Sequence, residues 1–177
     1  ASDNSTIAVT FSEAVYTTTD AATALVVGDF AFSISGGTAT LSSATPSSIS
    51  ISGNVYTLGI SLSGTPDGGE TLTVNPLTAT AIYDTGGNAA AASQSNNTAT
   101  LNDQTAPSAF TTGTVTTTGG TVTSGYWNST NTGLSVSVPI DNDASLTDGT
   151  VQLKGKTGTN SYADLGSAVT ITSSDLD

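Results

Sequence analysis

The stretch LNDQTAP, residues 101–107, divides the chain into two sets of alternating apolar segments. It starts at the expected end of a strand and continues with two oxygen-bearing side chains, Asn102 and Asp103. It ends at Pro107, which cannot donate a backbone hydrogen bond to a neighbouring strand. We therefore interpret it as the joint between two β-sandwich modules, residues 1–104 and residues 105–177.

Apolar and polar residues alternate with period two before the joint, which is typical of half-buried strands. A strand is predicted at 70–74 and another at 78–83, whereas the polar residues 1–5 are expected to be frayed. Turn-forming residues such as Gly53 and Asn54 separate the strands. The clearest alternations are Ile7, Val9 and Phe11; Phe30, Phe32 and Ile34; and Tyr56, Leu58, Ile60 and Leu62, the last predicting a central strand.

The second module repeats this pattern over fewer segments. Leu134, Val136, Val138 and Ile140 form its cleanest alternation, and no segment has a convincing helical period. Many short strands between turn signals predict an all-β chain of two tandem sandwiches. The second sandwich lacks strands to complete it and the first lacks one before Ile7, so we expect a window on a longer array, or a strand supplied by another chain.

Composition excludes several classes of function. The formal net charge is −12, and Lys154 and Lys156 are the only basic side chains. Binding to nucleic acid or to anionic membranes needs many more. No apolar run is long enough to span a bilayer, so we expect no membrane insertion. Without histidine or cysteine there is no Ser-His or Cys-His pair, and we expect no enzymatic activity.

Four pieces of the first module occur in a recognisable order. They are VTFSEAV at 9–15, GDF at 28–30, YDTGGNA at 83–89 and DQTAP at 103–107. Together they resemble the bacterial immunoglobulin-like repeats of giant cell-surface adhesins, over roughly residues 5–107. The segment VPIDNDASLTDGTVQL at 138–153 is similar to another repeat of such proteins. The resemblance implies two immunoglobulin-like modules of a secreted, extracellular surface protein, with further repeats as neighbours.

Carboxylates at strand ends suggest a calcium site, because Ca²⁺ takes six to eight oxygen ligands. A sandwich could bring Glu13, Asp84 and Asp103 together near one pole, with Asn102 as a further ligand. The resemblance supports this interdomain Ca²⁺ site more than the spacing does. The alternative is that Asp84 caps a turn and Asp103 is a solvated linker charge.

A second candidate calcium site lies in the second module. Asp141 and Asp143 are two residues apart and point the same way in an extended chain, and Asp148 follows across a short loop. The alternative is that Asp148 simply opens a turn with Gly149. Asp67 and Glu70 flank a predicted hairpin, and we interpret them as turn residues rather than ligands.

Three functions remain open from the sequence. The first is a stalk that projects a distal binding region, stiffened by Ca²⁺ at the joint. The second is a carbohydrate-binding module in which Tyr126 and Trp127 stack on a surface glycan, although a lone tryptophan more often covers a core edge. The third is a filament or surface-layer subunit that accepts a strand from its neighbour.

Overall fold

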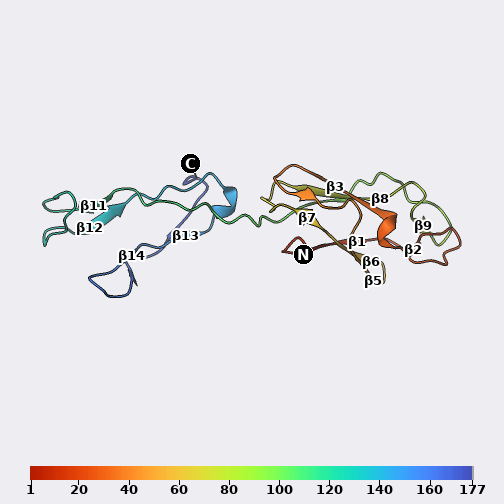
Figure 1. Ribbon diagram of the computed structural model, residues 1–177, viewed down its shortest axis with the longest axis horizontal. Coiled ribbons are helices and arrows are strands. Elements are labelled where there is room, and N and C mark those ends of the chain that lie inside the picture. The colour runs from red at the N-terminus through yellow and green to blue at the C-terminus, as the bar shows by residue number, and fades with distance from the viewer. Residues whose placement is uncertain (177) are drawn as a thin grey trace. The chain divides into compact units, whose positions relative to one another are not determined.

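The computed structural model describes residues 1–176 as an all-β chain, as predicted, and adds two short 3-10 helices (Figure 1). It divides into two compact units, Ala1–Thr105 and Ala106–Asp177. The division lies one residue from the boundary expected at the LNDQTAP stretch.

The first unit contains two three-stranded antiparallel sheets. In one sheet β6 lies between β1 and β5, and in the other β8 lies between β10 and β3. The β5–β6 hairpin turns at Gly53, whose φ of +58° is accessible to a residue without Cβ. The bounds are β1 Thr6–Thr10, β3 Phe30–Ser35, β5 Ile49–Ser52, β6 Val55–Gly59, β8 Thr71–Pro76 and β10 Thr98–Thr100.

Two short strand pairs and a 3-10 helix complete this unit. Strand β2 (Val15–Tyr16) pairs with β9 (Tyr83–Asp84), and β4 (Thr40–Leu41) pairs with β7 (Leu62–Ser63). The helix η1 (Val27–Asp29) leads directly into β3. Every pairing is antiparallel.

The core of the first unit is built from the period-two faces of β3, β6 and β8. Leu58 and Leu72 are 0% exposed and Phe30 is 1% exposed. The rings of Phe11 and Tyr56 meet edge to face, with centroids 5.3 Å apart, an arrangement that aromatic pairs favour. The alternations predicted from sequence therefore identify the core-forming strands.

Three local predictions were wrong. The expected strand at 78–83 is reduced to β9, because no neighbouring strand pairs with the residues before Tyr83. The strand predicted to continue to Leu62 ends at Gly59, because Leu62 belongs to β7, which pairs with β4 instead. The N-terminal residues are not frayed: Asn4 is buried through specific hydrogen bonds described below.

The second unit consists of three two-stranded pairs and the helix η2 (Ala144–Leu146). Among its described residues, Ile171 is the only buried hydrophobic side chain. The strand predicted at 134–140 ends at Val136, and Pro139 has no amide with which to continue a ladder. The pairs are β11 (Val115–Thr118) with β12 (Gly133–Val136), β13 (Thr150–Val151) with β16 (Val169–Thr170), and β14 (Lys154–Gly155) with β15 (Ala163–Asp164).

A search of the described residues for helices long and apolar enough to cross a bilayer finds none.

Candidate functional site

Glu70 is a fully buried carboxylate immediately before β8. Its Oε1 accepts hydrogen bonds from the amides of Thr38 (2.9 Å) and Ala39 (2.8 Å). Its Oε2 accepts from the amides of Asp67 and Gly68, both at 3.1 Å. One side chain therefore connects the loop after β3 to the loop before β8.

The environment of Glu70 favours its charged form. Burial by itself would raise the pKa of this carboxyl group, but the hydrogen bonds from Ala39, Asp67 and Thr38 outweigh it, and the net pKa lies below the ordinary value. The backbone approaches closely, since a Cβ added to Gly37 would overlap the Glu70 carboxyl group. Glu70 is thus a fixed anion that holds two loops together.

The turn interpretation of Asp67 and Glu70 is therefore only partly right. Asp67 Oδ1 does accept a hydrogen bond from the Gly69 amide at 2.9 Å, as in a turn. However, β7 and β8 do not form a hairpin, because they belong to different sheets. Glu70 was predictable as a core-facing residue: Glu70, Leu72 and Val74 are two residues apart and share one face of a strand.

Asn4 joins the N-terminal segment to the residues after β10. Its Nδ2 donates to the carbonyl oxygen of Asn102 at 2.7 Å, and its Oδ1 accepts from the Asn102 amide at 2.9 Å. Asn4 has a φ of +57°, a left-handed conformation that asparagine adopts more readily than most residues. The N-terminus and the end of the unit are thereby fastened side by side.

We expect Asn4→Ala to lower the free energy of unfolding of the first unit by about 1–2 kcal/mol, because the Asn102 backbone groups lose both partners. Asn4→Asp keeps the acceptor but loses the donor, and should have a smaller effect. Denaturant titration of the full chain measures both. Equal unfolding midpoints for wild type and Asn4→Ala would show that the hydrogen bonds between Asn4 and Asn102 do not stabilise the first unit.

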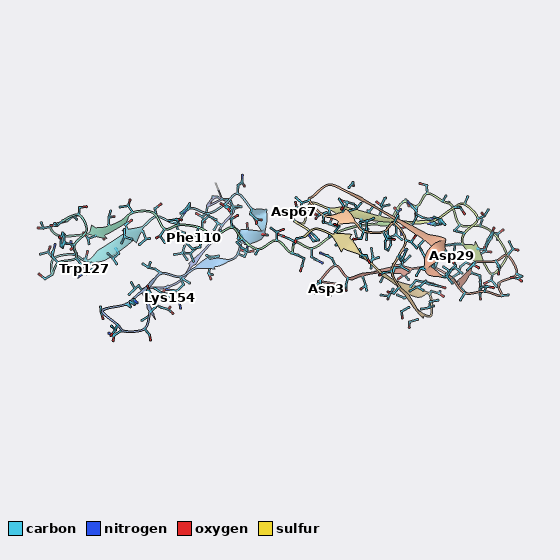
Figure 2. All side chains as sticks on the ribbon, viewed as in Figure 1. Asp3, Asp29, Asp67, Phe110, Trp127 and Lys154 are labelled. Carbon is cyan, nitrogen blue, oxygen red and sulfur yellow. The ribbon has the colours of Figure 1, made fainter. Side chains whose placement is uncertain are left out.

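The residues after Asn102 are also attached to the first unit. Asp103 Oδ1 accepts from the Thr105 amide at 2.7 Å, and Thr105 Oγ1 donates to the Pro66 carbonyl oxygen at 3.0 Å. The Gln104 amide donates to the same carbonyl at 2.9 Å. Figure 2 labels Asp3 and Asp67 at this end of the unit and Asp29 at the other.

Glu13 and Asp84 lie at the opposite end of the unit from Asn102 and Asp103. Strand β1 leads from the Asn4 end towards Glu13, and Asp84 pairs with Val15, two residues after Glu13. The five residues of β1 alone span about 16 Å. These four predicted ligands therefore do not form one site. Alternating apolar and polar residues predict where strands form, but they do not predict which strand ends lie together in the fold.

Asp84 forms a local cap, which was the alternative interpretation. Its Oδ1 accepts from the Asn88 amide and its Oδ2 from the Asn88 side chain, both at 2.8 Å. These hydrogen bonds lower the pKa of Asp84, and the one from the Asn88 side chain has the larger effect. The carboxylate fixes the YDTGGN loop.

The three aspartates of the second unit have separate local roles. Asp143 caps η2 by accepting a hydrogen bond from the Ser145 amide at 2.9 Å. Hydrogen bonding by the Ser145 side chain, and then by its amide, lowers the pKa of Asp143. The Asp148 amide donates to the Ile171 carbonyl oxygen at 2.9 Å, and the residue has a φ of +69°. The Asp141 carbonyl oxygen accepts from the Asp143 amide at 2.8 Å. Nowhere in residues 1–176 do three acidic side chains gather closely enough to hold a metal ion.

Tyr126 and Trp127 are largely solvent-exposed, at 71% and 57%. With Val115 and Leu134 they line a hollow of about 300 Å³ beside the β11–β12 pair. Figure 2 labels Trp127 near these strands. Trp127 therefore does not cover a core edge, which was the alternative to stacking on a ligand.

Comparisons with known proteins find no matching family, and no curated protein or solved structure with significant similarity.

Proposed function

We propose that the chain is an extender segment of a secreted bacterial surface adhesin, built from immunoglobulin-like modules. The attachment of the joint supports this role most directly. Gln104 and Thr105 hydrogen-bond to Pro66, and Asn102 is fastened to Asn4. Because the joint segment is hydrogen-bonded to the first unit, tension along the chain acts on these hydrogen bonds and not on a flexible linker.

The sequence resemblance is the second support for the extender role. The matching pieces include two loops of the first unit that an aspartate carboxylate fixes, the Asp84–Asn88 cap and the Asp103–Thr105 turn. An extender needs no catalytic group, which agrees with a composition without histidine or cysteine.

Calcium remains part of the proposal, but the predicted ligand set does not fit one joint site. The net charge of −12 attracts cations, and Asn102 and Asp103 are the predicted ligands nearest the joint. If Ca²⁺ binds there, the first unit gains stability as RT ln(1 + [L]/Kd), about 2.7 kcal/mol at a hundredfold excess over Kd.

The test is thermal melting of the full chain with Ca²⁺, with Mg²⁺ and with chelator. We expect Ca²⁺ alone to raise the melting temperature of the first unit by several degrees. Asp103→Asn should abolish the rise, whereas Glu13→Gln, at the far end, should keep it. Identical melting curves with Ca²⁺ and chelator would remove calcium from the proposal without affecting the extender role.

The exposure of Trp127 favours carbohydrate binding as a second candidate function. An exposed aromatic face can stack on a sugar ring. A glycan array probed with wild type and with Trp127→Ala would decide this, and an absence of binding to any glycan would reject it.

A further inference from the structure

A groove runs between the edge strands of the two sheets of the first unit. Its volume is about 390 Å³, and every residue that lines it belongs to this unit. Strand β1 forms one side and β10 the other, while no charged side chain lines it. Its apolar wall comes mainly from Ile7, Val9, Phe11, Phe30 and Val74.

Both strands that border the groove have an unpaired edge. β1 pairs only with β6, and β10 pairs only with β8. The Ile60 amide donates to the Ser5 carbonyl oxygen (2.8 Å) and the Phe11 amide donates to the Asn54 carbonyl oxygen (3.0 Å). Odd-numbered residues of β1 therefore face β6, and the backbone groups of Ala8 and Thr10 face away from it.

The core is incompletely covered along this side. Ile7 and Val9 point their side chains towards the core but stay half-buried, whereas Tyr56 and Leu58 on the adjacent strand are 4% and 0% exposed. An open strand edge beside half-buried core residues is the arrangement that accepts an added strand.

The second unit contains a segment with matching properties. Residues 133–140, GLSVSVPI, are uncharged and place Leu134, Val136, Val138 and Ile140 on one face when extended. Residues 133–136 pair with β11 and the Ser137 carbonyl oxygen accepts from the Gly113 amide at 2.7 Å, whereas 138–140 lie outside any strand and Leu134 is 42% exposed. Because burying an unpaired charge in an uncharged groove is unfavourable, the occupant of the groove must be neutral, as this segment is.

We propose that residues 133–140 of a second copy of this chain add to the open edge of β1 and fill the groove. The added strand supplies hydrogen-bond partners to Ala8 and Thr10 and covers Ile7 and Val9. Pro139 is tolerated because an added strand has one outer edge. Each copy offers one groove and one donor segment, so this heterologous contact links copies head to tail, as open chains or as closed rings. The inference does not depend on the extender role.

The test is sedimentation velocity of the full chain over increasing concentration. Wild type should form a series of oligomers. Ala8→Pro removes an amide from the open edge, and Val138→Asp places a charge on the donor face. Each should weaken self-association by at least about tenfold. The matched controls Ala8→Ser and Ser137→Asp should associate like wild type.

Mixing the two variants separates loss of a contact from misfolding. Ala8→Pro copies keep an intact donor segment, and Val138→Asp copies keep an intact groove. The mixture should therefore form heterodimers, which cannot grow further because the remaining groove and the remaining donor segment both carry a substitution. A wild-type chain that stays monomeric at all concentrations would overturn the proposal. So would oligomers that both variants leave intact, or a mixture that does not associate.

Discussion

Glu70→Ala is expected to lower the free energy of unfolding of the first unit by about 3 kcal/mol. The substitution leaves the amides of Thr38, Ala39, Asp67 and Gly68 without their acceptor. A buried donor that loses its partner costs about 1–3 kcal/mol, and water entering the space offsets part of the sum. Denaturant titration followed by tyrosine fluorescence measures the change.

The tyrosine signal reports mainly the first unit, which holds three of the five tyrosines, and the single tryptophan reports the second unit separately. Trp127, the only tryptophan, lies in the second unit, so its fluorescence should report an unchanged transition in Glu70→Ala. Glu13→Gln, at an exposed carboxylate, is the matched control and should keep the wild-type stability. A wild-type midpoint for Glu70→Ala would mean that the two loops hold together without the carboxylate.

Glu70 also predicts acid sensitivity of the first unit. Its folded pKa lies below the ordinary value of 4.5. A carboxyl group whose pKa is lower in the folded than in the unfolded state stabilises the fold at every pH above its unfolded pKa. This stabilisation is lost as the pH falls from 4.5 through the lower pKa of the folded state. Glu70→Gln removes this titration, so as pH falls below about 4.5 its stability should fall less steeply than that of wild type, by up to about 1.4 kcal/mol per pH unit. Equal slopes would show that other carboxylates dominate acid unfolding.

The strands that build the core were predictable because burial on one face forces apolar residues into period two. Phe30 and Phe32, Tyr56 and Leu58, and Leu72 and Val74 all follow this rule. The segment at 134–140 follows it equally well, yet only half of it pairs. Alternation identifies a chain that can form a strand, but a strand forms only where a neighbouring edge accepts its hydrogen bonds.

The candidate ligands were harder to place, because their positions depend on topology rather than on local sequence. Glu13 and Asp103 both follow strands, but β1 and β10 run in opposite directions, so the two residues lie at opposite ends. The burial of Asn4 depends on Asn102, ninety-eight residues away. Glu70 is different: its register with Leu72 and Val74 already indicated the core face.

Leu58→Ala is expected to produce a comparably large loss, of about 3 kcal/mol, in the free energy of unfolding of the first unit. Leu58 is 0% exposed and lies on β6, the central strand of its sheet, where Ile7 and Ile49 are its cross-strand neighbours. Truncation removes apolar contact and leaves a cavity that a strand paired on both sides cannot close, a combination that costs about 2–5 kcal/mol.

The matched control is Ile51→Ala on the neighbouring strand β5, where the side chain is 42% exposed. It removes a similar hydrocarbon but opens no enclosed cavity, so we expect a loss below about 1 kcal/mol. Denaturant titration of both variants gives the difference directly. Equal losses would mean that β6 does not form the centre of the core. A large loss for Leu58→Ala alone would locate the stability of the first unit between its two sheets.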